Sequence, residues 1–193
     1  MRRLSLTIAL LVLLAEPAAA SASSTQSLTF EAPRELLDPS TRDRTLDEIR
    51  AFGVDRVRVL AYWQNFAPDP RSKRRPAFDA TDPGAYPAGA WSRLDELFDA
   101  AQARGIAVQL TLTGPVPRWA TASKRDNVTK PSPKEFQAFA TAVGRRYGDR
   151  VGLWSIWNEP NQPQFLGPQY RKGKPYSPRL YRRLYQELSL IHI

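Results

Sequence analysis

Short apolar runs alternate along the chain with longer segments in which apolar residues recur every three or four positions. The short runs are rich in β-branched and aromatic residues, which is typical of strands, and they cover residues 28–30, 56–63, 106–112 and 151–157. The longer segments have helical spacing, each is followed by glycine, and they cover residues 40–52, 91–104 and 133–147. Pro178 opens a fourth helical segment. The pattern therefore predicts four consecutive strand–helix units.

Strands that alternate with helices of this length predict right-handed crossovers and a parallel sheet. The strands lack clean polar alternation, as expected when both sheet faces are buried. A doubly wound sheet and a (β/α)8 barrel both fit this order. No strand runs into the glycine-rich phosphate loop of a nucleotide-binding doubly wound sheet. We therefore expect an α/β fold, a partial (β/α)8 TIM barrel made of its first four βα units.

The N-terminus has the features of a secretory signal peptide. Two arginines precede an apolar stretch, residues 4–14, and small-residue cleavage sites end at Ala20 and Ala22. About eleven apolar residues are too few to span a membrane. Residues 1–22 are therefore predicted to be a signal peptide, and export of a cysteine-free chain suggests a secreted bacterial protein. After cleavage we expect no membrane association.

The last six residues, LSLIHI, differ in composition from the rest of the chain. They match the translation of CTG TCT CTT ATA CAC ATC, the mosaic end of a transposase-based sequencing adapter. Residues 188–193 are therefore predicted to be a non-native tail, with the native reading frame ending near Glu187. Residues 23–187 would then be the N-terminal half of a barrel.

The 28 basic residues outnumber the 19 acidic ones, for a formal charge of +9. The basic residues cluster at 71–75, 124–125 and 171–174, among Pro, Gly and Ser. Such clusters fit an anionic partner, but solvated loop charge is the favoured interpretation, and no nucleic-acid partner is expected. The chain has no cysteine and a single histidine, His192, so neither a metal site nor another cofactor is expected.

In a barrel, functional groups gather at the C-terminal ends of the strands. Here those ends carry carboxylates, an amide, one arginine and several aromatic faces: Glu31, Arg58, Tyr62, Trp63, Trp119, Trp157, Asn158 and Glu159. Aromatic faces suit sugar rings, and glycoside hydrolysis requires a carboxylic acid beside the leaving oxygen. The residues alone thus favour a sugar-active enzyme with a polysaccharide or oligosaccharide substrate.

The stretch WSIWNEPN, residues 154–161, resembles the fourth-strand signature of clan A glycoside hydrolases, and is most similar to the cellulase-type family 5 and family 39-like members. The resemblance implies that Glu159 is the general acid/base and that Asn158 binds the sugar 2-hydroxyl. Arg58, in VRVLAYW, resembles the arginine that keeps the nucleophile ionised. The strand order and the loop GPVPRWA also fit.

The resemblance implies a secreted, retaining hydrolase of β-linked poly- or oligosaccharides, a cellulase-type O-glycosyl hydrolase. The family nucleophile ends strand seven, which this chain does not reach. A fragment of this extent is therefore expected to be inactive. Its open edges at the first and fourth strands, and an apolar inner face, would make it associate. A non-catalytic carbohydrate-binding barrel and a binder of anionic polymers remain alternatives.

Each candidate residue also has a structural alternative. Glu159 could be a surface acid, Asn158 a turn former, and Arg58 a partner of Asp55 or Asp95. The three tryptophans expected at the substrate could instead be core residues: Trp63, Trp119 and Trp157.

The spacing of the motif raises a geometric question. A period of two places Asn158 and Glu159 on opposite sides of a strand, whereas the family directs both toward the sugar. The strand is therefore predicted to end or twist near Trp157. Pro160 is expected to hold Glu159 in extended geometry.

Overall fold

The computed structural model describes residues 25–188 and contains a four-stranded parallel sheet with the order β1-β2-β3-β4. The strands are β1 (Thr29–Phe30), β2 (Arg56–Tyr62), β3 (Ala107–Thr113) and β4 (Leu153–Ile156). Neighbouring strands in space are neighbours in sequence, as in successive units of a barrel. This confirms the predicted partial TIM barrel. The predicted signal peptide and residues 189–193 lie outside the described residues.

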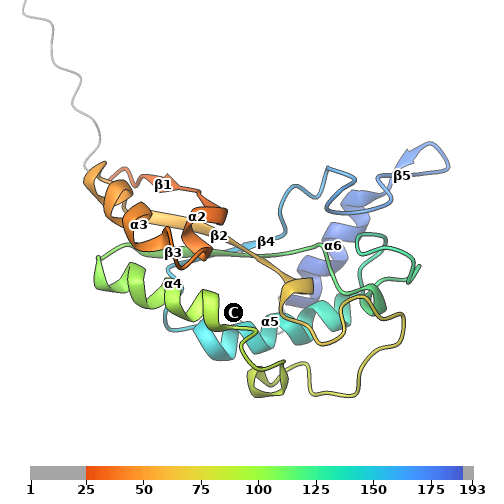
Figure 1. Cartoon of the computed structure of the whole chain (residues 1–193). Helices are drawn as coiled ribbons and strands as arrows, with labels where there is room; N and C mark the ends of the chain where they lie inside the picture. The colour runs from red at the N-terminus through yellow and green to blue at the C-terminus, as the bar shows by residue number, and fades with distance from the viewer. Residues whose placement is uncertain (1–24, 189–193) are drawn as a thin grey trace, which may run out of the picture.

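Four helices match the predicted helical segments: α3 (Arg42–Ala51), α4 (Ser92–Ala103), α5 (Pro133–Tyr147) and α6 (Ser177–Leu188). Leu188, the first residue of the predicted tail, is the buried last residue of α6. Figure 1 shows α4 and α5 beneath the sheet, and the long loops after β2, β3 and β4 gathered at one end of it. No helix in the described range is long and apolar enough to cross a membrane.

The structure also contains short elements that the sequence pattern did not predict. Helix α2 (Pro33–Leu37) and a hairpin of β5 (Tyr170–Arg171) and β6 (Lys174–Pro175) were not expected. Three 3-10 turns also lie in the loops: η1 (Trp63–Asn65), η2 (Pro83–Ala85) and η3 (Arg118–Ala120). These segments of two to five residues are too short to show a hydrophobic period.

Helix α5 shows how local sequence fixes an element of the fold. The Ser132 hydroxyl caps its N-terminus by accepting a hydrogen bond from the Glu135 amide, and Pro133 occupies the first turn. One face of the helix is buried against the sheet and its loops: Phe136, Phe139, Ala140 and Val143. The helix therefore covers the ends of the strands from which the site is built.

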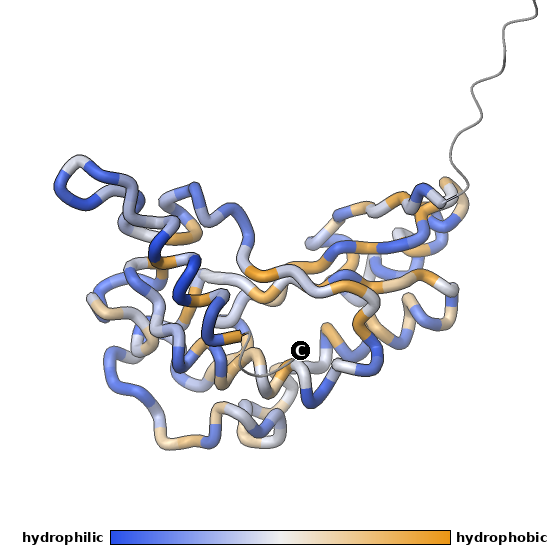
Figure 2. Tube along the Cα trace, turned by 180° about the vertical axis from the view of Figure 1, so that it is seen from behind, coloured by the Kyte–Doolittle hydropathy of each residue, from blue (hydrophilic) through white to orange (hydrophobic). Residues whose placement is uncertain are grey.

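The two faces of the sheet differ sharply. Valine, leucine and alanine alternate onto the helix-covered face and are all buried: Val57, Val59, Ala61, Val108, Leu110 and Leu112. The opposite face carries a polar ladder in which Arg58 Nε donates to Thr111 Oγ1 (3.1 Å) and Gln109 Nε2 donates to Ser155 Oγ (2.7 Å). Figure 2 shows the apolar colour concentrated along the central strands.

The polar ladder corrects the expectation of an apolar inner face. Positions 58, 109, 111 and 155 place polar side chains on the face opposite the helices, although Leu60 and the half-exposed Leu153 share it. The strands therefore do alternate. The alternation was not recognised in the sequence because arginine, glutamine and threonine occupy only some of the alternate positions, and leucine occupies others.

Candidate active site

Glu31 and Asn158 lie just beyond β1 and β4, and they meet Arg58, which was predicted at the end of its strand but is the third residue of β2. Arg58 projects from β2, and its Nη1 lies 2.7 Å from Glu31 Oε2, just beyond β1. Its Nη2 donates to Asn158 Oδ1, beyond β4, at 2.9 Å. With the Nε bond to Thr111, the guanidinium binds groups from the other three strands. These three bonds hold the guanidinium in one orientation, so Arg58 positions the side-chain amide of Asn158.

The structure does not pair Arg58 with either carboxylate that sequence reasoning offered as an alternative. Asp55 Oδ2 accepts a hydrogen bond from the Leu28 amide at 2.8 Å. Asp95 binds the side chains of Arg146 and Tyr147 on α5. Glu31, named only as an early strand-end acid, is the ion-pair partner. Parallel register explains this: Phe30 lies opposite Val57, so the next residues, Glu31 and Arg58, face each other.

The chain changes direction immediately after β4. Strand β4 ends at Ile156, and the left-handed φ angles of Trp157 (65°) and Glu159 (41°) turn the backbone. The backbone amide of Asn158 donates a hydrogen bond to Thr113 Oγ1 at 3.0 Å, which fixes the turn to the end of β3. The prediction that the strand ends near Trp157 is confirmed. Positive φ is costly for residues with side chains and is concentrated at functional sites.

The prediction of extended geometry for Glu159 is wrong. Proline disfavours the helical region for the residue before it, yet the φ of Glu159 is left-handed. Hydrogen bonds on both sides hold the turn: the Trp157 amide donates to the Leu112 carbonyl (2.8 Å), and the Gln162 amide donates to the Glu159 carbonyl (2.9 Å). These constraints outweigh the local preference.

The side chain of Glu159 is exposed, whereas Asn158 and Tyr62 beside it are partly buried. Burial raises the pKa of the Tyr62 phenol, and the negative charges of Glu31 and Glu159 act in the same direction, against the charge of Arg58. Tyr62 therefore lies in the electrostatic field of all three charged groups. Glu31 is also exposed but is ion-paired with Arg58, so Glu159 is the carboxylate of this cluster that is exposed and has no ion-pair partner within residues 25–188.

The tryptophans predicted at the substrate are core residues in this structure. Trp63 is 1% exposed and stacks on Phe139 with ring centroids 5.6 Å apart. Trp157 is 4% exposed, and its Nε1 donates to the Phe165 carbonyl. Neither ring has a free face for a sugar, which corrects both predictions. Helix α5 is the reason, because its phenylalanines cover these rings.

Trp119 is also mostly buried, at 5% exposed, and its Nε1 donates to the Pro68 carbonyl at 3.1 Å. It meets Trp63 edge to face at 5.9 Å, and the Arg75 guanidinium lies over its ring. Stacking of a sugar on its face is therefore not possible in this arrangement. Trp119 is also one of the residues that line a cavity beside the N-terminus of α5.

Sequence reasoning missed the two buried threonines that support the site. The Thr111 hydroxyl accepts a hydrogen bond from Arg58 Nε, and the Thr113 hydroxyl accepts one from the backbone amide of Asn158. They continue, with Gln109, an alternation of polar positions along β3, which was an available signal. Gly114 follows them. A Cβ there would lie 2.9 Å from Trp157 Cζ2, so glycine allows the Trp157 ring to pack against β3.

The site contains carboxylates, an amide, an arginine and hydroxyls, a set suited to acid/base chemistry on a hydroxyl-rich ligand. Within residues 25–188, no three His, Cys, Asp or Glu side chains are grouped in a way that could hold a metal ion. Residues 18–168 match the family model described as Cellulase (glycosyl hydrolase family 5). The chain belongs to glycosyl hydrolase family 5. The match includes β1 to β4 and the Asn158–Glu159 turn of this family 5 domain.

Solved structures of glycosidases share the fold of this family 5 chain. GH5_18 from Streptomyces cattleya, solved with GlcNAc, has a TM-score of 0.58 and 21% identity, over 88% of this chain and 42% of that one. Fpglu1 from Fervidobacterium pennivoraus has a TM-score of 0.54 and 20% identity, over 78% and 36%. A family 39 glycoside hydrolase from Bacteroides cellulosilyticus WH2 has a TM-score of 0.52 and 17% identity, over 86% and 29%.

The chain thus spans less than half the length of these three solved structures. Among curated proteins, none matches it. At these identities the likeness establishes the shared fold, and the family 5 match establishes the family.

Proposed function

We propose that this chain supplies the acid/base half of the active site of a secreted, retaining β-glycoside hydrolase that acts on a β-linked poly- or oligosaccharide. The observation that carries the proposal is the turn after β4, which exposes Glu159 beside an Asn158 amide held by Arg58. Membership of a glycosyl hydrolase family supports it. Secretion rests on the signal-like residues 1–22.

In this proposal Glu159 acts twice. Its carboxylic acid first donates a proton to the leaving glycosidic oxygen, and its carboxylate then removes a proton from the attacking water. Asn158 would bind the sugar hydroxyl next to the reacting carbon, in the orientation that Arg58 imposes. Rigid placement of such groups is worth several orders of magnitude in rate, because the reacting atoms need no further ordering.

A retaining mechanism requires a second carboxylate about 5 Å from the first. Glu31 is ion-paired with Arg58 at 2.7 Å, an arrangement that fits a supporting residue better than a nucleophile. We therefore propose that the nucleophile is supplied by sequence outside this chain. Expressed alone, the chain is expected to hydrolyse no aryl β-glycoside and to associate through its open edges. A soluble monomer with hydrolytic turnover would refute this.

The role of Glu159 is testable in the complete open reading frame. Glu159→Gln should lower kcat/KM by about 10²–10⁴ for a β-glycoside with a poor leaving group, because protonation by a positioned acid contributes about this factor. The loss should be much smaller for a dinitrophenyl glycoside, whose leaving group needs no proton. Glu48→Gln, at an exposed position on α3, is the matched control. Equal losses for both leaving groups would contradict the assignment.

A further inference from the structure

The loops at the C-terminal end of the sheet are strongly basic. We define the loop face as residues 63–91, 114–132 and 157–176, the segments that follow β2, β3 and β4. It contains eleven Lys and Arg residues and five Asp and Glu residues. Across residues 25–188, Arg75 alone of these eleven forms an ion pair, with Glu135 at 2.8 Å. The other ten charges are not neutralised by neighbouring carboxylates.

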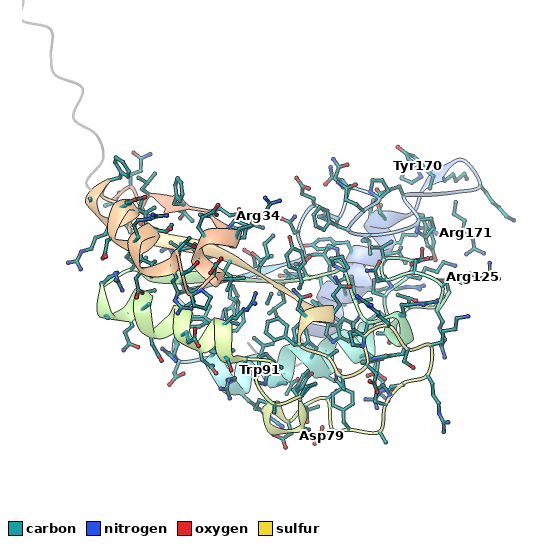
Figure 3. All side chains as sticks on the ribbon, in the orientation of Figure 1. Arg34, Asp79, Trp91, Arg125, Tyr170 and Arg171 are labelled. Atoms are coloured by element: carbon teal, nitrogen blue, oxygen red, sulfur yellow. The ribbon has the colours of Figure 1, made fainter. Side chains whose placement is uncertain are left out.

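Three of these arginines converge on one cavity of about 430 Å³ between the loops after β2 and β3. Arg71 comes from the first loop, and Arg118 and Arg125 come from the second. The guanidinium groups of Arg71 and Arg125 are exposed and make no hydrogen bond or ion pair within the described chain. Figure 3 shows Arg125 at the loop end of the molecule, the end at which Arg171 of the third loop is also labelled.

The remaining lining of the cavity is mostly amide. Asn127 Nδ2 donates to Gln64 Oε1 at 2.9 Å, which leaves the Asn127 oxygen and the Gln64 nitrogen for other partners, and Asn65 adds a third amide. Amides can both donate to and accept from hydroxyl groups. Arginine forks suit the two oxygens of a carboxylate or a sulfate. The lining as a whole matches a hydroxyl-rich anion.

The single carboxylate in the lining, Asp126, is already engaged. It accepts hydrogen bonds from the amides of Val128 (3.0 Å) and Thr129 (2.7 Å) and from the Ser123 hydroxyl. Burial acts to raise the pKa of Asp126, but these hydrogen bonds outweigh it and lower the pKa below its usual value. Its charge therefore orders the turn, and an anion in the cavity would face three arginines.

Backbone hydrogen bonds between and within the loops fix the shape of the cavity. The Arg118 amide donates to the Pro70 carbonyl (2.8 Å) and the Gln64 amide donates to the Pro115 carbonyl (3.1 Å), so the two loops are fastened together. The Val116 amide also donates to the Asn127 carbonyl at 2.8 Å. A volume of about 430 Å³ lies within the range of about 300–1,000 Å³ that is usual for small-ligand sites.

A second basic cavity, of about 510 Å³, is lined by other residues of the same segment, 121–130. Lys124, Lys130 and Arg183 contribute to its lining, together with Trp119 and Tyr176. One cavity of this kind would fit a single charged unit. Two cavities that share one loop fit a longer chain that carries repeated negative charges.

We infer that the cavity of Arg71, Arg118 and Arg125 is a subsite for an anionic sugar unit, bearing a carboxylate or a sulfate ester, of an acidic glycan. The inference rests on the proposed function, because it takes the ligand to be a sugar chain that also reaches Glu159. Both features lie at the same end of the parallel sheet, where β2, β3 and β4 end. The subsite would select an acidic substrate over a neutral one.

Calorimetric binding to the complete protein tests this directly, in a Glu159→Gln background that prevents turnover. The probes share one backbone: cellotetraose, the same chain oxidised to uronates at C6, and the same chain with sulfate esters. We expect a charged probe to bind about tenfold or more tightly than cellotetraose at low salt, with the difference reduced near 0.15 M salt. Comparison of the uronate with the sulfated probe identifies the charged group.

Matched double variants separate the subsite from overall charge. Arg71→Gln with Arg125→Gln should abolish the preference for charged probes. Arg44→Gln with Arg50→Gln removes the same charge from exposed positions on α3 and should preserve the preference. Equal binding of neutral and charged probes, or equal losses in both double variants, would overturn the inference.

Activity assays distinguish a failure of this inference from a failure of the proposed function. If the wild-type protein cleaves a neutral aryl β-glycoside but the loop variants bind all probes alike, only the subsite is refuted. If charged probes bind through Arg71 and Arg125 while no glycoside is cleaved, the binding site stands and the hydrolase assignment fails.

Discussion

Ion pairing differs in frequency between the loop face and the rest of residues 25–188, where six of the fifteen basic residues are ion-paired. At the helices, arginines meet carboxylates across neighbouring elements: Arg42 with Glu96, Arg104 with Asp47, Arg146 with Asp95, and Arg150 with Asp99. On the loop face, ten of eleven basic residues lack such a partner within the described chain. Some arginines outside the loop face therefore link neighbouring helices, whereas almost all basic residues of the loop face have no carboxylate partner within residues 25–188.

The contrast changes the interpretation of the net charge. Residues 25–188 outside the loop face have 15 basic and 13 acidic residues and are close to neutral, so most of the positive charge belongs to the end that carries Glu159. Solvated loop charge, the interpretation favoured from the sequence, also places these residues in the loops, but it does not require the loops to meet at one end of the sheet. A one-sided field instead attracts anions to the end where strands of this fold place their functional groups.

The two regions share one aromatic core, and removing its centre should have the largest effect on stability. Trp63 begins the loop after β2 and packs on Phe136, Phe139 and Trp119. Trp63→Ala should lower the free energy of unfolding of the complete protein by about 3–5 kcal/mol, the usual cost of truncating a large buried aromatic residue. Denaturant unfolding measures it. Trp63→Phe should cost much less, and equal losses would argue against a packing role.

Arg58 is the exception on the functional end, because it is fully partnered. Arg58→Lys keeps the charge but cannot reach Glu31, Thr111 and Asn158 together, so we expect a loss of about 1–3 kcal/mol. The side-chain amide signals of Asn158 should shift in NMR spectra. Glu31→Gln is the informative comparison: it removes one charged partner and should perturb Asn158 less. Unchanged Asn158 signals in Arg58→Lys would show that Arg58 does not position the amide.

Strand order was predictable, whereas packing was not. The order of the strands follows from the alternation of strands and helices, whereas the meeting of Arg58, the third residue of β2, with Asn158 depends on the long arginine side chain. The burial of Trp63 depends on phenylalanines of α5, more than 70 positions later, and no local pattern reports that. Likewise, the left-handed φ of Glu159 is imposed by hydrogen bonds to β3 and within the loop.

The Asp95 network is the clearest case of compensated charge in the helical region. Asp95 accepts hydrogen bonds from Arg146 Nε (2.9 Å) and from Tyr147 Oη (2.7 Å), with Arg146 Nη2 also bound. Asp95→Asn should lower the free energy of unfolding by about 1–2 kcal/mol. The expected loss is small because the side chains of Asp95 and Arg146 are both about a third exposed. Asp99→Asn, whose carboxylate is mostly exposed, should cost less.

The same network predicts how stability changes with pH. Burial acts to raise the pKa of Asp95, but the hydrogen bonds from Arg146 and Tyr147 and the positive charge of Arg146 outweigh it, so the pKa is lowered. The unfolded chain then binds the proton first as the pH falls. The contribution of Asp95 should be complete above its ordinary pKa of about 3.9 and should be lost as the pH falls through the lowered folded value. In Asp95→Asn this part of the acid destabilisation should be absent.

The smallest expected effect is on the loop face, and it completes the comparison. Arg125→Gln removes an exposed charge with no carboxylate partner, so the free energy of unfolding should change by less than about 0.5 kcal/mol. Arg146→Gln, on α5, removes a paired charge of the same type and should cost about 1–2 kcal/mol. Parallel denaturant titrations measure both. If Arg125→Gln lowered the free energy of unfolding as much as Arg146→Gln does, the loop charges would have a structural role and would not be available for an anionic ligand.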